Sequence, residues 1–142
     1  MKQLPDSLGF LLGDISRLMR QKFRAQIEGS SLTPSQAKAL IHVSRNEGIR
    51  QVDLAEMMEV QPITLARLLD NLVAAGTVER RADPADRRAY RIFLTDAAAP
   101  HLAAIHHVAD ALQADALRTL SKAQAASVMA ALRAMRENLS SR

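Results

Sequence analysis

The sequence predicts a mainly α-helical protein with a small β-hairpin, and two patterns of apolar residues carry this prediction. Over six segments the apolar residues recur at intervals of three and four, which places them on one face of a helix. After residue 76 this period ends, and Tyr90, Ile92 and Leu94 alternate with Arg91 and Phe93, as in a half-buried strand. With 142 residues, the chain is long enough to form one domain with a buried core.

Two helices are expected in the first third of the chain. The first covers residues 8–27, with Asp6 or Ser7 as its cap and a Gly-Ser-Ser stretch after its end. The second begins at a Thr-Pro-Ser-Gln sequence that starts at Thr33, which combines a capping threonine with proline and glutamine at favourable positions. It ends near residue 46, before a Glu-Gly pair.

The third and fourth helices are short and follow each other closely. The third covers residues 51–58, and the fourth begins after a Gln-Pro pair at Gln61. The fourth ends at Gly76, a residue suited to the left-handed conformation that terminates helices. The residues expected on the buried side of the third helix are Val52, Leu54, Ala55 and Met58.

Two strands are expected next, at residues 78–81 and 90–94, with an Asp-Pro turn signal in the connection 82–88. The pair is therefore predicted to be a hairpin with a long tip. Thr95 is expected to cap a fifth helix that runs to about Leu120. A capping box that begins at Ser121 opens a sixth helix, which runs to about Leu139.

Two short helices joined by residues 59–61 and followed by a hairpin make a winged helix-turn-helix. In this arrangement the second helix enters the DNA major groove and the hairpin, or wing, reaches toward the minor groove. The apolar face of the fourth helix is formed by Leu65, Leu68, Leu69 and Leu72. Arg67 is expected to point away from that face, with Ile63, Asp70, Asn71 and Ala74 beside it. Taken alone, this helix could equally be an ordinary amphipathic helix with a solvated polar face.

The wing carries a cluster of positive charge. The whole chain has 19 Lys and Arg residues against 15 Asp and Glu, and the excess gathers mainly at Arg80, Arg81, Arg87, Arg88 and Arg91. Five like charges on one ribbon repel each other unless an anion is bound, so the cluster predicts a polyanionic partner.

The composition argues against several other classes of protein. Without cysteine there can be no disulfide and no thiolate metal site, and no motif for nucleophilic catalysis or phosphate binding occurs, so we expect neither an enzyme nor a cofactor. His101, His106 and His107 lack the spacing of a helical metal pair, which disfavours a zinc sensor. No segment is apolar enough to span a membrane or to serve as a signal, so a cytoplasmic location is expected.

The chain resembles the MarR family of bacterial transcriptional regulators, and within it the SlyA branch. The matching residues are Leu54-Ala55, Gln61-Pro62, Arg67-Leu68-Leu69-Asp70-x-Leu72 through Gly76, Asp83-x-x-Asp86-Arg87-Arg88 and Leu94-Thr95-Asp96. The wing pattern is the specific part of this match. Two positions depart from the family pattern, because Ile63 replaces a frequent serine and Arg50 stands where a capping threonine or serine is common.

The resemblance implies a homodimeric repressor that binds a pseudo-palindromic DNA operator, with residues 33–95 as the DNA-binding lobe and residues 1–32 and 96–142 as dimerisation helices. Of the 25 alanines, 15 lie between residues 97 and 134, which independently favours close helix packing. The expected DNA contacts are Gln61, Pro62, Ile63, Thr64, Arg67 and Asn71 in the fourth helix and Asp86, Arg87, Arg88 and Arg91 in the wing. Arg88 would enter the minor groove with its guanidinium oriented by Asp86, while Arg87 and Arg91 would meet phosphates.

The resemblance further implies a small anionic or aromatic effector, by analogy a phenolic acid or its thioester, bound where the first, second and fifth helices meet. The residues available to line that pocket are Leu11, Leu12, Ile15, Met19, His42 and His107, with Arg17 or Arg20 to neutralise a carboxylate. The alternative is that these residues are simply core and interface. For the protein as a whole, the alternative is a winged-helix protein-interaction module without ligand control.

Overall fold

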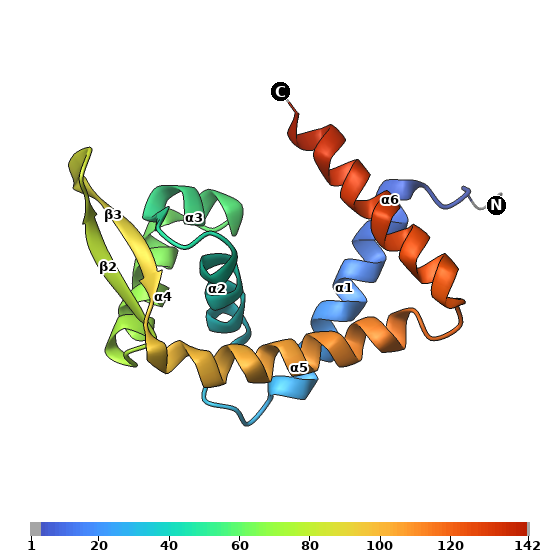
Figure 1. Cartoon of the computed structure of the whole chain (residues 1–142), viewed down its shortest axis with the longest axis horizontal. Helices are drawn as coiled ribbons and strands as arrows, with labels where there is room; N and C mark the ends of the chain where they lie inside the picture. Colours follow the sequence, from blue (N-terminus) through green and yellow to red (C-terminus); the bar gives the residue numbers. More distant parts are fainter. Residues whose placement is uncertain (1–3, 142) are drawn as a thin grey trace. The chain divides into compact units, whose positions relative to one another are not determined.

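In the computed structural model, which describes residues 4–141, the chain is helical apart from a small three-stranded sheet (Figure 1). The elements are α1 (Leu8–Ile27), α2 (Pro34–Arg45), β1 (Ile49–Arg50), α3 (Gln51–Met57), α4 (Pro62–Ala74), β2 (Val78–Asp83), β3 (Asp86–Leu94), the 3₁₀ turn η1 (Asp96–Ala98), α5 (Ala99–Ala116) and α6 (Lys122–Ser140). The chain divides into two compact units, Met1–Val108 and Ala109–Arg142, which are described separately. Residues 1–3 and 142 of the predicted domain lie outside the described part.

Side-chain caps mark the starts of α1, α2 and α6, as predicted. The Ser7 hydroxyl accepts a hydrogen bond from the Phe10 backbone N–H at the start of α1. Both predicted capping boxes are confirmed, at Thr33 for α2 and at Ser121 for α6. Each box satisfies two backbone N–H groups that a helix start leaves without partners.

The prediction for Thr95 is wrong. Its hydroxyl donates to the backbone carbonyl of Gly76 and makes no capping bond, and the chain passes through η1 before α5 begins. The Thr95 backbone N–H also bonds to the carbonyl of Thr77. Thr95 therefore ties the end of the hairpin to the end of α4, which competes with a capping role.

The core of the first unit lies among α2, α3, α4, the base of the sheet and the start of α5. Its buried residues are Ile27, Ala37, Ala39, Leu40, Val43, Leu54, Ala55, Met58, Leu65, Leu69, Leu72, Val78, Ile92 and Ile105. Val52 was expected among them, but its side chain is 55% exposed. The seven-residue helix α3 buries Leu54 and Ala55, followed by Met58 just after its end, and Val52 lies about 200° around the helix from Leu54.

The hairpin is longer and tighter than the sequence suggested. β2 and β3 extend through most of the predicted connection, and only Pro84 and Ala85 form the turn. A third strand, β1, was missed because two residues are too few for an alternating pattern. β1 and β2 both pair antiparallel with β3, which is the central strand. The far end of the β2–β3 ribbon projects beyond the neighbouring helices (Figure 1).

In the second unit, most of α6 is exposed, and no residue of that helix is buried. Leu120, Val128, Leu132 and Leu139 are large apolar residues exposed there. Within residues 4–141, none of the helices has the length and hydropathy needed to cross a bilayer.

Candidate nucleic-acid interface

The outward face of α4 is confirmed as the sequence predicted it. Leu65, Leu69 and Leu72 are buried, and Leu68 is half-buried. The opposite side of the helix is exposed and consists of Ile63, Thr64, Arg67, Asp70, Asn71 and Ala74. Gln61 and Pro62, at the start of the helix, are exposed as well.

Asp70 on this face is engaged by Arg80 of β2. The Arg80 guanidinium lies 2.8 Å from the Asp70 carboxylate and donates to the Ala66 carbonyl at 3.0 Å and to the Gln51 side chain at 3.1 Å. Arg80 thus fastens the middle of α4 to the base of the wing and to the start of α3. Since Asp70 is taken by Arg80, Arg67 has no carboxylate partner among residues 4–141.

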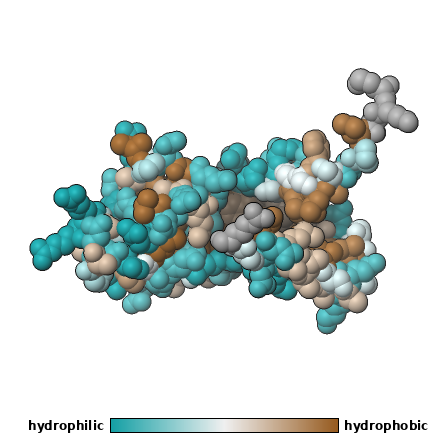
Figure 2. Space-filling model, turned by 90° about the horizontal axis from the view of Figure 1, so that it is seen from above, coloured by the Kyte–Doolittle hydropathy of each residue, from teal (hydrophilic) through white to brown (hydrophobic). Residues whose placement is uncertain are grey.

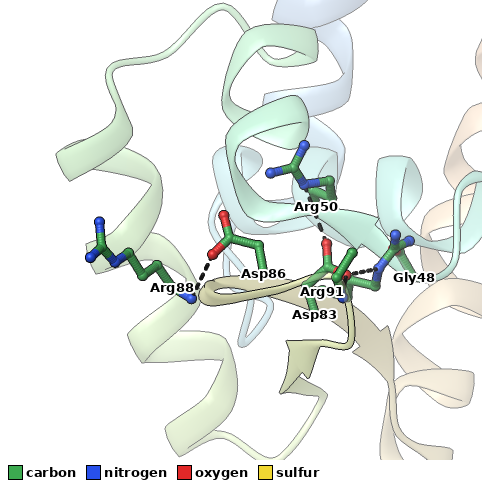
Figure 3. A network of polar contacts seen from close by, with 7 residues as sticks. Gly48, Arg50, Asp83, Asp86, Arg88 and Arg91 are labelled. Atoms are coloured by element: carbon green, nitrogen blue, oxygen red, sulfur yellow. Dashed lines mark hydrogen bonds and ion pairs between the residues drawn. The ribbon is translucent and has the colours of Figure 1, made fainter.

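A second ionic group joins the wing to β1, and it centres on Asp83. The Asp83 side chain is only 3% exposed, and its two carboxylate oxygens lie 3.4 Å from Arg91 Nε and 3.5 Å from Arg50 Nε (Figure 3). Arg91 also donates to the carbonyl of Gly48 at 3.1 Å. Arg91 is therefore bound to Asp83 and Gly48 although its side chain stays 41% exposed, and these contacts argue against the expected phosphate contact.

Gly48 supports this group through its backbone conformation. Its φ of +84° is one that residues with a side chain rarely adopt, and a Cβ there would lie 3.3 Å from the Phe93 ring. The chain can therefore pass close to Phe93 and present the Gly48 carbonyl to Arg91.

The surroundings of Asp83 favour its charged form. A hydrogen bond from the Ala85 backbone N–H lowers the pKa of Asp83 most, burial acts in the opposite direction, and Arg91 and Arg50 lower the pKa further. A carboxylate whose pKa is lowered by folding stabilises the fold above its unfolded value near 3.8, and this stabilisation is lost as the pH falls through the folded value.

Replacing Asp83 with asparagine should therefore lower the melting temperature at pH 7, because Arg50 and Arg91 lose their counter-charge. The difference from the unmodified protein should shrink as the pH falls below about 4, because the carboxyl of the unfolded chain binds a proton there and that of folded Asp83 follows at lower pH. Thermal melts monitored by circular dichroism between pH 3 and 7 measure both effects. Asp53→Asn, at an exposed aspartate of α3, is the control and should show no such converging difference.

Arg81 is also engaged within the wing. It donates to the carboxylate of Glu79, and its guanidinium lies 3.9 Å from the centroid of the Phe93 ring. Together with the Arg80 and Arg91 contacts, this means that three of the five wing arginines have internal carboxylate partners. The argument that five unneutralised cations repel each other on the ribbon is therefore wrong.

The two remaining arginines lie at the wing tip, where the strand pairing is irregular. Ala82 pairs with Tyr90, but its neighbour Asp83 pairs with Asp86, so residues 87–89 of β3 have no partner on β2. Such bulges redirect side chains from the sheet. Arg87 and Arg88 are exposed, and neither has a carboxylate partner in the described part of the chain. The projecting left end of the molecule in Figure 2 is accordingly hydrophilic.

Asp86 acts on the backbone of Arg88 and not on its guanidinium. Its carboxylate accepts a hydrogen bond of 2.9 Å from the Arg88 backbone N–H. The Arg88 side chain extends away from Asp86 (Figure 3). The predicted orientation of the guanidinium by Asp86 is thus wrong, because the short side chain of Asp86 closes a local turn to the amide two residues later.

A hollow of about 280 Å³ separates the wing from the starts of α3 and α4. Arg50, Val52, Pro62, Arg88 and Tyr90 are among the residues that line it. Sequence reasoning did not place Arg50 or Tyr90 at this site. For Arg50 the sequence did hold a signal, because arginine stands where the family often has a capping threonine or serine. Arg50 leaves α3 without a side-chain cap and instead contacts Asp83.

The residues predicted to form an effector pocket have mixed surroundings. Leu11, Leu12 and Ile15 are exposed on α1, Met19 is half-buried, and His107 is exposed. Arg17 lies 3.3 Å from Asp14, and Arg20 donates to the Ser16 hydroxyl at 2.7 Å. Burial, followed by the charges of Lys38 and Arg45, lowers the pKa of His42 and so favours its neutral form.

Metal-ligating side chains do not gather in the structure between residues 4 and 141. Within that stretch, no three His, Asp or Glu side chains form a group that could hold a metal ion.

A model of the MarR family matches residues 32–90 of the chain. The transcriptional regulator HosA of Escherichia coli O111:H- is 34% identical over 98 residues, which cover 69% of this chain and 73% of HosA. The chain belongs to the MarR family. It is a DNA-binding transcriptional regulator, and its relatives are regulators and not enzymes.

Solved structures of MarR regulators share the fold over nearly the whole chain. A crystal structure of MarR superimposes with a TM-score of 0.85 at 26% identity, covering 98% of this chain and 95% of that one. A mutant of S. aureus MepR bound to an oligodeoxyribonucleotide has a TM-score of 0.61 at 25% identity, covering 95% and 99% of the two chains. The winged helix and its flanking helices are thus the architecture of this family.

Proposed function

We propose that this MarR regulator is a homodimeric repressor that reads a pseudo-palindromic operator, with α4 in the major groove and the wing tip in the minor groove of each half-site. The distribution of unpaired charge is the observation that carries the proposal. Arg67 on α4 and Arg87 and Arg88 at the wing tip have no carboxylate partner within residues 4–141, whereas the other wing arginines do. Exposed cations without partners are the groups that phosphates attract.

Each free arginine has its own proposed contact. Arg67 reaches a guanine edge or a phosphate across the major groove. Arg88 enters the minor groove, where a narrow A·T-rich segment concentrates negative potential, and Arg87 contacts a phosphate beside it. The remaining contacts on α4 are Gln61, Pro62, Ile63, Thr64 and Asn71, all of them exposed. Asp86 supports the tip through its bond to the Arg88 backbone.

Replacing Arg88 with alanine should weaken binding to all sequences and reduce the slope of log affinity against log salt by about one ion. Arg91→Ala is the matched comparison, because it removes the same charge from the same strand. Since Arg91 is bound to Asp83 and Gly48, that variant should lower the melting temperature and leave the salt slope nearly unchanged. Fluorescence anisotropy with a labelled duplex from 50 to 300 mM salt measures the slopes. Equal slopes for Arg88→Ala and the unmodified protein would remove Arg88 from the interface.

The dimer is proposed to form through residues 1–32 and 96–142, with residues 33–95 as the DNA-binding lobe. The support is the exposure of apolar residues on the flanking helices, namely Leu8, Phe10, Leu11, Leu12, Ile15 and Leu18 on α1 and Val128, Leu132 and Leu139 on α6. A soluble monomer rarely exposes so many large apolar residues on neighbouring turns. A second copy of the chain covers them in this proposal, and the two recognition helices then lie about one DNA turn, ~34 Å, apart.

Release by a small effector is proposed at the junction of α1, α2 and α5. Arg20 is better placed than Arg17 to bind a carboxylate of the effector, because Arg17 is already paired with Asp14 whereas Arg20 donates to the Ser16 hydroxyl. His42, whose neutral form is favoured, adds a hydrogen-bonding group to this junction. A ligand that prefers a dimer with mis-spaced recognition helices weakens DNA binding a hundredfold if the coupling is about 2.7 kcal/mol.

Effector control is tested with a panel of phenolic acids and their thioesters. A true effector raises the melting temperature and releases the duplex, and added duplex weakens its binding by the same factor, since coupling is reciprocal. Arg20→Ala should abolish these effects for carboxylates. If no compound shifts the melting temperature or releases DNA, the protein is a constitutive repressor.

A further inference from the structure

The first turn of α4 presents an isoleucine where a DNA-reading surface would be expected to be polar. The Ile63 side chain is 65% exposed, and it directly follows Pro62, the first residue of the helix. Single apolar residues are common on protein surfaces, so exposure alone decides nothing. The position of Ile63 is informative, because the N-terminal residues of a recognition helix are those that approach base edges.

Ile63 and Arg67 lie on one line along the outward face. They are four residues apart, one turn of helix, and both lie opposite the buried leucines of α4. Asp70, the next side chain along this line, is 65% exposed and its charge is paired with the Arg80 guanidinium at 2.8 Å. Ala74, one turn further, has too short a side chain to reach far. The long side chains at the centre of this face that have no ionic partner within residues 4–141 are therefore one aliphatic group and one guanidinium.

The major groove offers an aliphatic side chain one apolar partner on the base edges. Adenine, guanine and cytosine present only hydrogen-bond donors and acceptors there, whereas thymine adds its 5-methyl group. We infer that Ile63 is a specificity-determining residue that selects thymine by contact with this methyl group. The inference rests on the proposed placement of α4 in the major groove. It adds the identity of one base, which that placement alone does not specify.

The helix geometry also gives the spacing between the two contacts. Four residues of an α-helix rise about 6 Å, and successive base pairs are about 3.4 Å apart. The thymine read by Ile63 therefore lies about two base pairs from the position that Arg67 contacts. In a pseudo-palindromic site this thymine occurs once in each half-site.

The experiment uses the full-length protein and a duplex selected for tight binding from a random library. Each thymine of the selected duplex is replaced in turn by deoxyuridine, which removes the methyl group and keeps the base pairing. One thymine in each half-site should show a loss of affinity of roughly fourfold, the effect of taking one methyl from an apolar contact. Ile63→Ala and Ile63→Ser should bind the thymine and deoxyuridine duplexes equally well.

Val73→Ala is the matched control, because Val73 is an exposed aliphatic residue on the last turn of the same helix, away from this line. It should retain the full sensitivity to deoxyuridine. The inference is overturned if the unmodified protein binds the selected duplex but no thymine shows sensitivity that depends on Ile63. If no duplex is enriched over random DNA, the proposed operator recognition fails, and this inference fails with it.

Discussion

Replacing Ile15 with aspartate should convert the proposed dimer into monomers and lower operator affinity about a hundredfold or more. Ile15 is 48% exposed on α1, among the apolar residues that the proposed dimer covers. A carboxylate placed in such an interface loses its hydration without gaining a partner. A monomer binds one half-site only, and linking two binding modules typically increases the overall affinity by a factor of about 10² to 10⁴. Sedimentation equilibrium measures the first effect, and a duplex titration measures the second.

Gly13→Asp is the matched control for this variant. It adds a carboxylate to the same helix about 160° around from Ile15, and a Cβ at Gly13 meets no atom within 4 Å. This variant should stay dimeric and bind DNA normally. If Ile15→Asp remains a dimer with unchanged affinity, α1 does not form the interface, and the exposed apolar residues there have another partner.

The sequence was sufficient for the helices because their signals are local. Thr33 with Gln36 and Ser121 with Gln124 form their boxes within one turn, so no distant contact is needed to set these helix starts. The outward direction of Arg67 follows likewise from the helical period and from the leucines on the opposite face. Thr95 shows the limit of such signals, because its distant partner Gly76 takes the hydroxyl that a cap would use.

The wing could not be predicted in the same way, because its contacts depend on strand register and on distant residues. Asp83 meets Arg91 across the hairpin and Arg50 from β1, a strand too short to leave a pattern. Counting charges along the chain could not distinguish Arg91 from Arg88. Arg91 is bound to Asp83, whereas Arg88 lies where β3 has no pairing with β2. The sequence thus located the basic element, and the structure distinguishes the arginines that have carboxylate partners from Arg87 and Arg88, which have none within residues 4–141.

Replacing Arg67 with alanine should lower operator affinity by about 1–3 kcal/mol, which is roughly five- to 150-fold. Asp70, three residues further along the helix, does not neutralise Arg67, because its carboxylate is bound to Arg80. The fold should be unaffected, since Arg67 is exposed and has no carboxylate partner between residues 4 and 141. Lys38→Ala, which removes one exposed charge from α2, controls for the change in net charge and should bind nearly as well as the unmodified protein.

Comparing cognate and random duplexes then distinguishes the two possible contacts of Arg67. If Arg67 reads a guanine, its loss weakens binding to the cognate duplex far more than to random DNA and relaxes specificity at one base pair. If it contacts a phosphate, both affinities fall together and the salt slope decreases by about one ion. Affinities that match those of the unmodified protein on both duplexes would remove Arg67 from the reading surface, and α4 would then contact DNA through its uncharged side chains alone.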